Sequence, residues 1–116
     1  MWTVTPHPRL HAHPRRTDPA RWKPLADAIP HLAWFRSERQ TFIPFATPAG
    51  DRQAVFTIHV QLAPLAEAVA APGRAAALHA ALGSMSGAVL AYRNLVHAQR
   101  PLMDWLARTA EAQRPT

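Results

Sequence analysis

The chain contains no cysteine and only 4 glycines among its 116 residues. Without cysteine it cannot form disulfides, thiolate zinc sites, iron–sulfur clusters or a cysteine nucleophile. The glycines are isolated and none precedes a Lys-Ser or Lys-Thr pair, which excludes a P-loop. The longest strongly apolar run, residues 82–90, is broken by glycine and serine and is shorter than the ~20 residues that cross a bilayer. No basic-then-apolar leader opens the sequence, so we expect a soluble cytoplasmic protein without a membrane partner.

Hydrophobic residues make up 48% of the chain and charged residues 17%, a balance that predicts one folded domain over residues 1–116. The 12 prolines argue against a long-helix bundle. The net charge is +6, and Lys23 is the only lysine, so the other basic residues are arginines. Arginine binds phosphate and carboxylate groups through paired hydrogen bonds, although an arginine-rich genome explains the same bias more simply.

Hydrophobic spacing predicts an α+β fold, with an antiparallel hairpin-based sheet followed by carboxy-terminal helices. The strands are rich in aromatic and β-branched residues, and proline and glycine mark the ends of the elements. The expected elements are, in order, a strand at 1–5, a proline- and arginine-rich loop at 6–19, a short helix at 24–29 that ends at Pro30, strands at 32–45 and 54–62 around a turn at 47–51, and helices at 64–70, at 74–82, near 89–96 and from Pro101 onward.

Strand 54–62 alternates in character, which places Phe56 and Ile58 on one face and Thr57 and His59 on the other. A sheet of two or three strands with one helical layer leaves a face and its edges uncovered. We therefore expect that the chain is part of a larger fold or pairs with a partner chain, as a homo-oligomer or with another protein.

A polar run at residues 36–41 interrupts the most apolar strand. On a strand, Arg36, Glu38 and Gln40 share a face and lie about 6.7 Å from one to the next, whereas Arg39 points the other way. A carboxylate between guanidinium groups can orient a cationic or hydrogen-bonding ligand. The alternative is a solvated strand face with an ordinary ion pair, worth under about 1 kcal/mol, and spacing alone favours this alternative.

Histidines provide the other candidate ligands. His59 on its alternating strand could ligate a metal or transfer protons, although a lone strand histidine is more often an ordinary surface residue. His7, His11 and His13 lie close together, but in a proline-rich loop without an acidic neighbour. A surface loop is therefore the favoured interpretation of these three residues.

Aromatic residues support two further interpretations. Tyr92 and Trp105 occur at helical spacing, which predicts core packing with a polar tip. Trp2 and Trp22 flank the basic amino-terminal loop, the one candidate surface for nucleic acid. The loop has no repeat of aromatic and basic residues, so nucleic acid is a disfavoured partner.

Residues 32–42, Leu-Ala-Trp-Phe-Arg-Ser-Glu-Arg-Gln-Thr-Phe, and residues 55–59, Val-Phe-Thr-Ile-His, resemble the heme-dependent oxidative N-demethylase family. That family carries an Arg-x-Glu-Arg-Gln-Thr-Leu strand, a turn, and a strand close to Phe-Thr-Ile-Arg. Downstream, residues 91–95 and 101–105 look like its closing helices. The resemblance covers nearly all of this chain but only the carboxy-terminal half of the family's domain, and His59 stands where the family has arginine.

The resemblance implies a PAS-like fold, a heme cofactor, and oxidative removal of a methyl group from a small amine, with electrons from a separate reductase. Glu38 would then be the catalytic carboxylate, for the amine or for proton delivery. Arg36 or Arg39 would bind a heme propionate. His11 and His59 are the candidates near the iron, and neither matches a family pattern for the iron ligand.

Two other functions stay open at this point. The chain could be a non-catalytic remnant or interaction subunit that keeps the fold and not the cofactor. It could also be a small basic nucleic-acid binder, which is the weakest of the three hypotheses.

Overall fold

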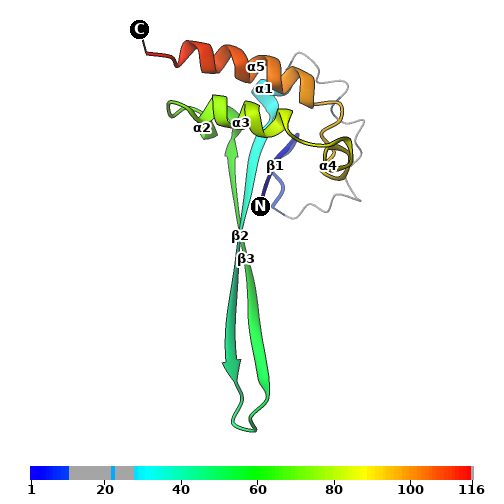
Figure 1. Ribbon diagram of the computed structural model, residues 1–116, viewed down its shortest axis with the longest axis vertical. Coiled ribbons are helices and arrows are strands. Elements are labelled where there is room, and N and C mark those ends of the chain that lie inside the picture. Colours follow the sequence, from blue (N-terminus) through cyan, green and yellow to red (C-terminus); the bar gives the residue numbers. More distant parts are fainter. Residues whose placement is uncertain (11–21, 23–27, 116) are drawn as a thin grey trace.

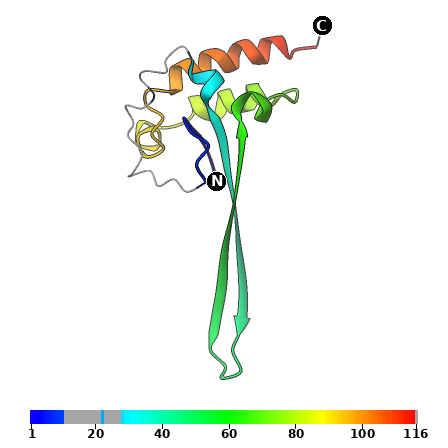
Figure 2. The same ribbon diagram turned by 180° about the vertical axis from the view of Figure 1, so that it is seen from behind.

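A long hairpin extends from a helical body at one end of the molecule (Figure 1). The computed structural model describes residues 1–10, 22 and 28–115, and it measures 61 × 37 × 25 Å along its principal axes. Figure 2 shows from behind that the helices gather at one end of the hairpin. We call the far part of the hairpin, residues 40–58, the arm, and the helices with the sheet base the body.

The described elements form a three-stranded antiparallel sheet and five helices, which confirms the α+β fold class. None of these helices is long and apolar enough to cross a membrane. The elements are β1 (Trp2–Thr5), α1 (Ile29–Leu32), β2 (Trp34–Ala46), β3 (Arg52–Pro64), α2 (Leu65–Ala68), α3 (Arg74–Gly83), α4 (Gly87–Tyr92) and α5 (Gln99–Ala112).

Strand β1 covers only the base of the hairpin. The sheet order is β1-β2-β3, and β1 pairs with residues 34–37 of β2. The rings of Trp2 and Phe35 stack with their centroids 5.9 Å apart. The guanidinium of Arg93 lies 5.3 Å from the centroid of the Trp2 ring and donates a 3.0 Å hydrogen bond to the Trp2 carbonyl oxygen. These contacts fasten β1 to both the sheet and the helices.

Strands β2 and β3 pair along their whole length of 13 residues each, as far as the turn at residues 47–51. Gly50 takes a φ of 87° in this turn, as its position in the sequence predicts. Because directly paired residues point to the same side of an antiparallel sheet, the register defines two faces. The Glu38 face carries the even-numbered residues 36–44 of β2 and 54–62 of β3, and the His59 face carries the odd-numbered residues 35–45 and 53–63.

Leucines fill the core of the body. Helices α3 and α5 pack together there, and Leu82 and Leu102 are both fully buried. Trp22 is 1% exposed and belongs to the same core. These residues supply the burial that the arm lacks, so the body provides most of the hydrophobic stabilisation of the chain.

Some predictions for the helices and loops do not hold. Tyr92 is 63% exposed rather than buried, because α4 ends there, Asn94 takes a φ of 57°, and the 3.6-residue period stops. Pro30 lies inside the first turn of α1 rather than ending a helix, a position that tolerates proline. His7 is buried, not on the surface. Residues 11–21 and 23–27 lie outside the described residues, and with them most of the predicted loop and of the helix at 24–29.

Replacing Leu102 by alanine tests the body core. We expect Leu102→Ala to lower the free energy of unfolding by about 2–5 kcal/mol, because it removes a fully buried side chain between packed helices. Urea unfolding followed by tryptophan fluorescence measures this change. The control is Val96→Ala, at a side chain that is 53% exposed, with an expected change within about 0.5 kcal/mol. Equal effects of the two substitutions would contradict this packing.

Candidate functional site

Arg36 is buried where the sheet base meets the loop after β1. It is 7% exposed, and its Nη1 donates a 3.0 Å hydrogen bond to the carbonyl oxygen of Arg9. Its Nη2 lies 3.4 Å from Oε1 of Glu38. The guanidinium therefore joins the loop after β1 to strand β2, and these contacts use two of its five N–H donors within the protein.

Glu38 is held in place by this contact. Its side chain is 21% exposed, compared with 9% for that of Arg36. Ion pairs between two exposed side chains are mobile and weak. A pair with one buried partner, such as Arg36 with Glu38, is held in a narrower range of positions. The structure therefore presents a half-buried carboxylate on the Glu38 face.

Arg39 and His59 form a direct cross-strand pair on the opposite side, the His59 face. Both side chains are exposed. The sheet thus divides the candidate residues into two sets, with Arg36 and Glu38 on one face and Arg39 and His59 on the other. His11 lies outside the described residues. Within one chain, the two sets cannot line one cavity, because the sheet itself lies between them.

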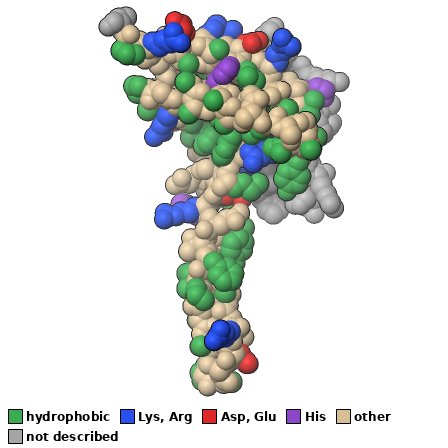
Figure 3. Space-filling view, in the orientation of Figure 1, with side chains coloured by type: hydrophobic (Ala, Val, Ile, Leu, Met, Phe, Trp, Pro, Cys, Tyr) green, Lys and Arg blue, Asp and Glu red, His purple; other side chains and the backbone are tan. Residues whose placement is uncertain are grey.

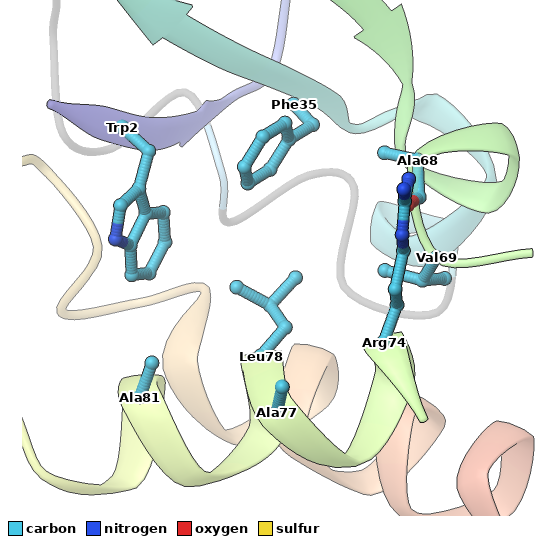
Figure 4. A pocket seen from close by; sticks show the side chains of 8 residues that line it. All are labelled: Trp2, Phe35, Ala68, Val69, Arg74, Ala77, Leu78 and Ala81. Carbon is cyan, nitrogen blue, oxygen red and sulfur yellow. The ribbon is translucent and has the colours of Figure 1, made fainter. Parts of the chain in front are cut away.

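An apolar cleft of about 360 Å³ lies at the base of the His59 face (Figure 4). Trp2 and Phe35 form its roof from the sheet, and Leu78 reaches toward them from α3. The Arg74 side chain stands at one side of the cleft, where its Nη1 donates a 3.4 Å hydrogen bond to the carbonyl oxygen of Ala68. The volume is near the lower end of the roughly 300–1,000 Å³ range of ligand pockets.

The cleft continues toward the arm. A second hollow shares Phe35 and Arg74 with it and adds Ser37 and Gln61, a cross-strand pair. The next pair on the same face is Arg39–His59, about 6.7 Å further along the strands. The two hollows end at Ser37 and Gln61, and Arg39 and His59 are exposed beyond them on the same face. We call this stretch of the sheet face, from the Trp2–Phe35 cleft to Arg39 and His59, the His59 trough.

The donor chemistry of the His59 trough fits heme. Phe35 and Leu78 offer apolar side chains to a flat macrocycle, and Arg39 and Arg74 offer guanidinium groups to its carboxylates. Imidazole is a common ligand of heme iron, and His59 supplies one. The trough is open on its outer side. Among the described residues there is no cluster of three or more metal-ligating side chains.

Sequence reasoning missed Arg74 and the cleft. Arg74 was expected only as the start of a helix, because it follows Pro72-Gly73. Its position beside Phe35 depends on how α3 crosses the sheet, and no spacing within the sequence records that crossing. The stacking of Trp2 on Phe35 also has no local signal in the sequence, because it follows from the register between β1 and β2.

Comparisons with known proteins agree with the sequence motif of β2 and β3. A family model described as haem-dependent oxidative N-demethylase, alpha subunit-like, matches residues 1–103. These residues include the sheet, both sets of candidate residues and helices α1 to α4. No curated protein matches the chain. Since the match covers most of its length, this chain belongs to the haem-dependent oxidative N-demethylase alpha subunit-like family.

Proposed function

We propose that this chain forms one wall of the heme-binding domain of an oxidative N-demethylase-like monooxygenase that acts on small methylated amines. The heme would supply oxygen activation, with electrons from a separate reductase. The chain corresponds to the carboxy-terminal half of such a domain, so the opposite wall comes from residues or a partner chain beyond those described.

The single observation that carries this proposal is the His59 trough. It brings an apolar cleft, an imidazole and two guanidinium groups onto one face of the sheet. His59 would hold the iron, and Arg39 and Arg74 would bind the propionates. Phe35 and Leu78 would pack against the macrocycle, beside the Trp2 ring that stacks on Phe35, and would exclude water from one side of it.

A second arrangement keeps Glu38 as the catalytic group. Its carboxylate, held 3.4 Å from the buried Arg36 guanidinium, would bind the ammonium group of the substrate or transfer its proton. Arg36 would then serve mainly as a positioning residue. This arrangement requires the heme on the Glu38 face, because Glu38 and His59 lie on opposite sides of the sheet.

The structure weakens the nucleic-acid hypothesis. Trp22 is 1% exposed, so its ring is not available to stack on a base. One face of Trp2 is covered by Arg93 and the ring stacks on Phe35. Neither tryptophan that flanks the basic loop is therefore a free stacking platform.

Titration with hemin tests the proposal directly. We expect a saturable one-to-one Soret band that shifts on reduction. His59→Gln should weaken hemin binding about tenfold or more, or at least about 1.4 kcal/mol, because the iron loses its imidazole. The matched control is His97→Gln, at an exposed histidine outside the trough, which should bind as the wild type does. A spectrum like that of free hemin would instead support the non-catalytic interaction subunit.

The guanidinium groups can be tested in the same titration. Arg39→Gln and Arg74→Gln should each weaken hemin binding, by up to about fivefold, as expected for exposed ion pairs. The loss should shrink at high salt, because the pairs are screened. Arg108→Gln, at an exposed arginine of α5, is the control. An equal effect of all three substitutions would mean that net charge, not the trough, attracts hemin.

Glu38→Gln separates the two arrangements. With heme in the His59 trough, we expect this substitution to leave hemin affinity unchanged, since Glu38 lies on the other face. Spectral changes on adding dimethylamine to the heme-loaded chain give the second readout. If Glu38→Gln loses these amine-induced spectral changes while His59→Gln and the control Glu67→Gln keep them, the result would favour a reaction on the Glu38 face instead.

A further inference from the structure

The outer edge of β3 has no partner strand in the described sheet. The strand order β1-β2-β3 leaves β3 at the edge along its 13 residues. Its distal half belongs to the arm, which stands away from the helices (Figure 1). An edge strand presents a row of unpaired backbone N–H and C=O groups that can pair with another chain.

Two backbone hydrogen bonds establish which residues point outward. The N–H of Glu38 donates to the carbonyl oxygen of Met1 at 2.8 Å, and that of Thr47 to Asp51 at 2.9 Å. Because consecutive residues of an antiparallel strand point to opposite edges, even-numbered residues of β2 face the β1 side and odd-numbered residues face β3. By the register, the even-numbered residues of β3 direct their N–H and C=O groups to the open edge.

The two open edges of the arm differ. On the β2 side, Pro44 is an outward-pointing residue, and it has no N–H to donate. On the β3 side, neither proline nor any Asp, Glu, Lys or Arg interrupts residues 53–63. Natural proteins use proline and charge to block edges, so the β2 edge is blocked and the β3 edge is not.

The arm also exposes large apolar side chains on both faces. Figure 3 shows apolar side chains along the arm in one view. On the Glu38 face, Phe42, Phe56 and Ile58 are 68%, 52% and 53% exposed. On the His59 face, Ile43 and Val55 are 51% and 47% exposed. Contiguous exposed apolar surface of this kind marks an interaction site.

We propose that this edge pairs with the same edge of a second copy of the chain. The two β3 strands would run antiparallel about a two-fold axis at Ile58 and join the two sheets into one of six strands, in the order β1-β2-β3-β3-β2-β1. The axis at Ile58 is the centre of the uncharged outward row from Ala54 to Leu62. Phe56 then pairs with Val60 of the second copy, an aromatic and β-branched pair that stabilises sheets.

Two features favour a second copy over a different protein. In this register no like charges lie opposite each other, because charged residues are absent from 53–63. The pairing also closes at two copies, since it uses the same edge of each chain and the other edge carries Pro44.

Matched proline substitutions on the two edges test the dimer. Ile58→Pro removes an N–H that points to the open β3 edge, and Gln40→Pro removes one that points to the β2 edge, at the residue directly opposite Ile58. In sedimentation equilibrium at micromolar concentration we expect a wild-type dimer, a dimer for Gln40→Pro and a monomer for Ile58→Pro, with similar circular dichroism spectra. A monomeric wild type would overturn the proposal in favour of a strand from another protein. A dimer for Ile58→Pro, or larger assemblies of the wild type, would also overturn it.

A spin label gives a test that does not depend on the proline variants. The chain lacks cysteine, so Gln53→Cys provides a single labelling position. In the proposed register, residue 53 of the two copies lies ten residues apart along the paired strands, or about 34 Å. Pulsed electron paramagnetic resonance should give a distance near this value. A distance that differs by more than the length of the label would exclude this register.

Discussion

The arrangement of the whole chain depends on a difference in strand length. Strand β1 has 4 residues and pairs only with the base of β2, whereas β2 and β3 continue together for 13. The body can therefore cover only the base of the hairpin. In the arm, β2 and β3 contact only each other and solvent, so backbone hydrogen bonds between the two strands, rather than burial of side chains, hold the arm together. The exposed aromatics, the open edge and the separation of the two faces all follow from this difference.

Two arginine side chains stabilise the base of the hairpin through contacts within the protein. Arg93 covers the Trp2 ring and caps its carbonyl, and the buried Arg36 joins the loop after β1 to Glu38. A buried guanidinium costs desolvation free energy unless its donors are satisfied, and the contacts of Arg36 with Arg9 and Glu38 satisfy two of them. The same use makes Arg36 less available to an external anion than Arg39 or Arg74. The arginines of the sequence thus include structural ones, Arg36 and Arg93, and ones with a proposed binding role, Arg39 and Arg74, and composition cannot separate the two groups.

The sequence predicts the sheet well and the site only in part. Alternation along residues 54–62 and the Gly50 turn predict the register of the hairpin, because hydrophobic period and turn type are local properties of the sequence. The same alternation predicts that Arg39 and Glu38 lie on opposite faces of the sheet. Tyr92 shows the limit of this reasoning, since a helical period predicts burial only while the helix continues, and Asn94 ends it. Arg74 and the apolar cleft depend on how α3 crosses the sheet. That crossing is a tertiary property without a local signal.

The proposed dimer and the proposed heme site are compatible in space. Pairing along the β3 edge extends the sheet in its own plane, so it leaves both faces open. Directly paired residues keep the same face, which would bring Thr57 of the second copy beside His59. The second arm would thus lengthen the His59 face at the end of the trough farthest from the helices. It would not close the trough, so the opposite wall of a heme site has to come from another segment. The proposed dimer therefore accounts for the open edge of the arm, and the proposed heme site depends on what covers the His59 face.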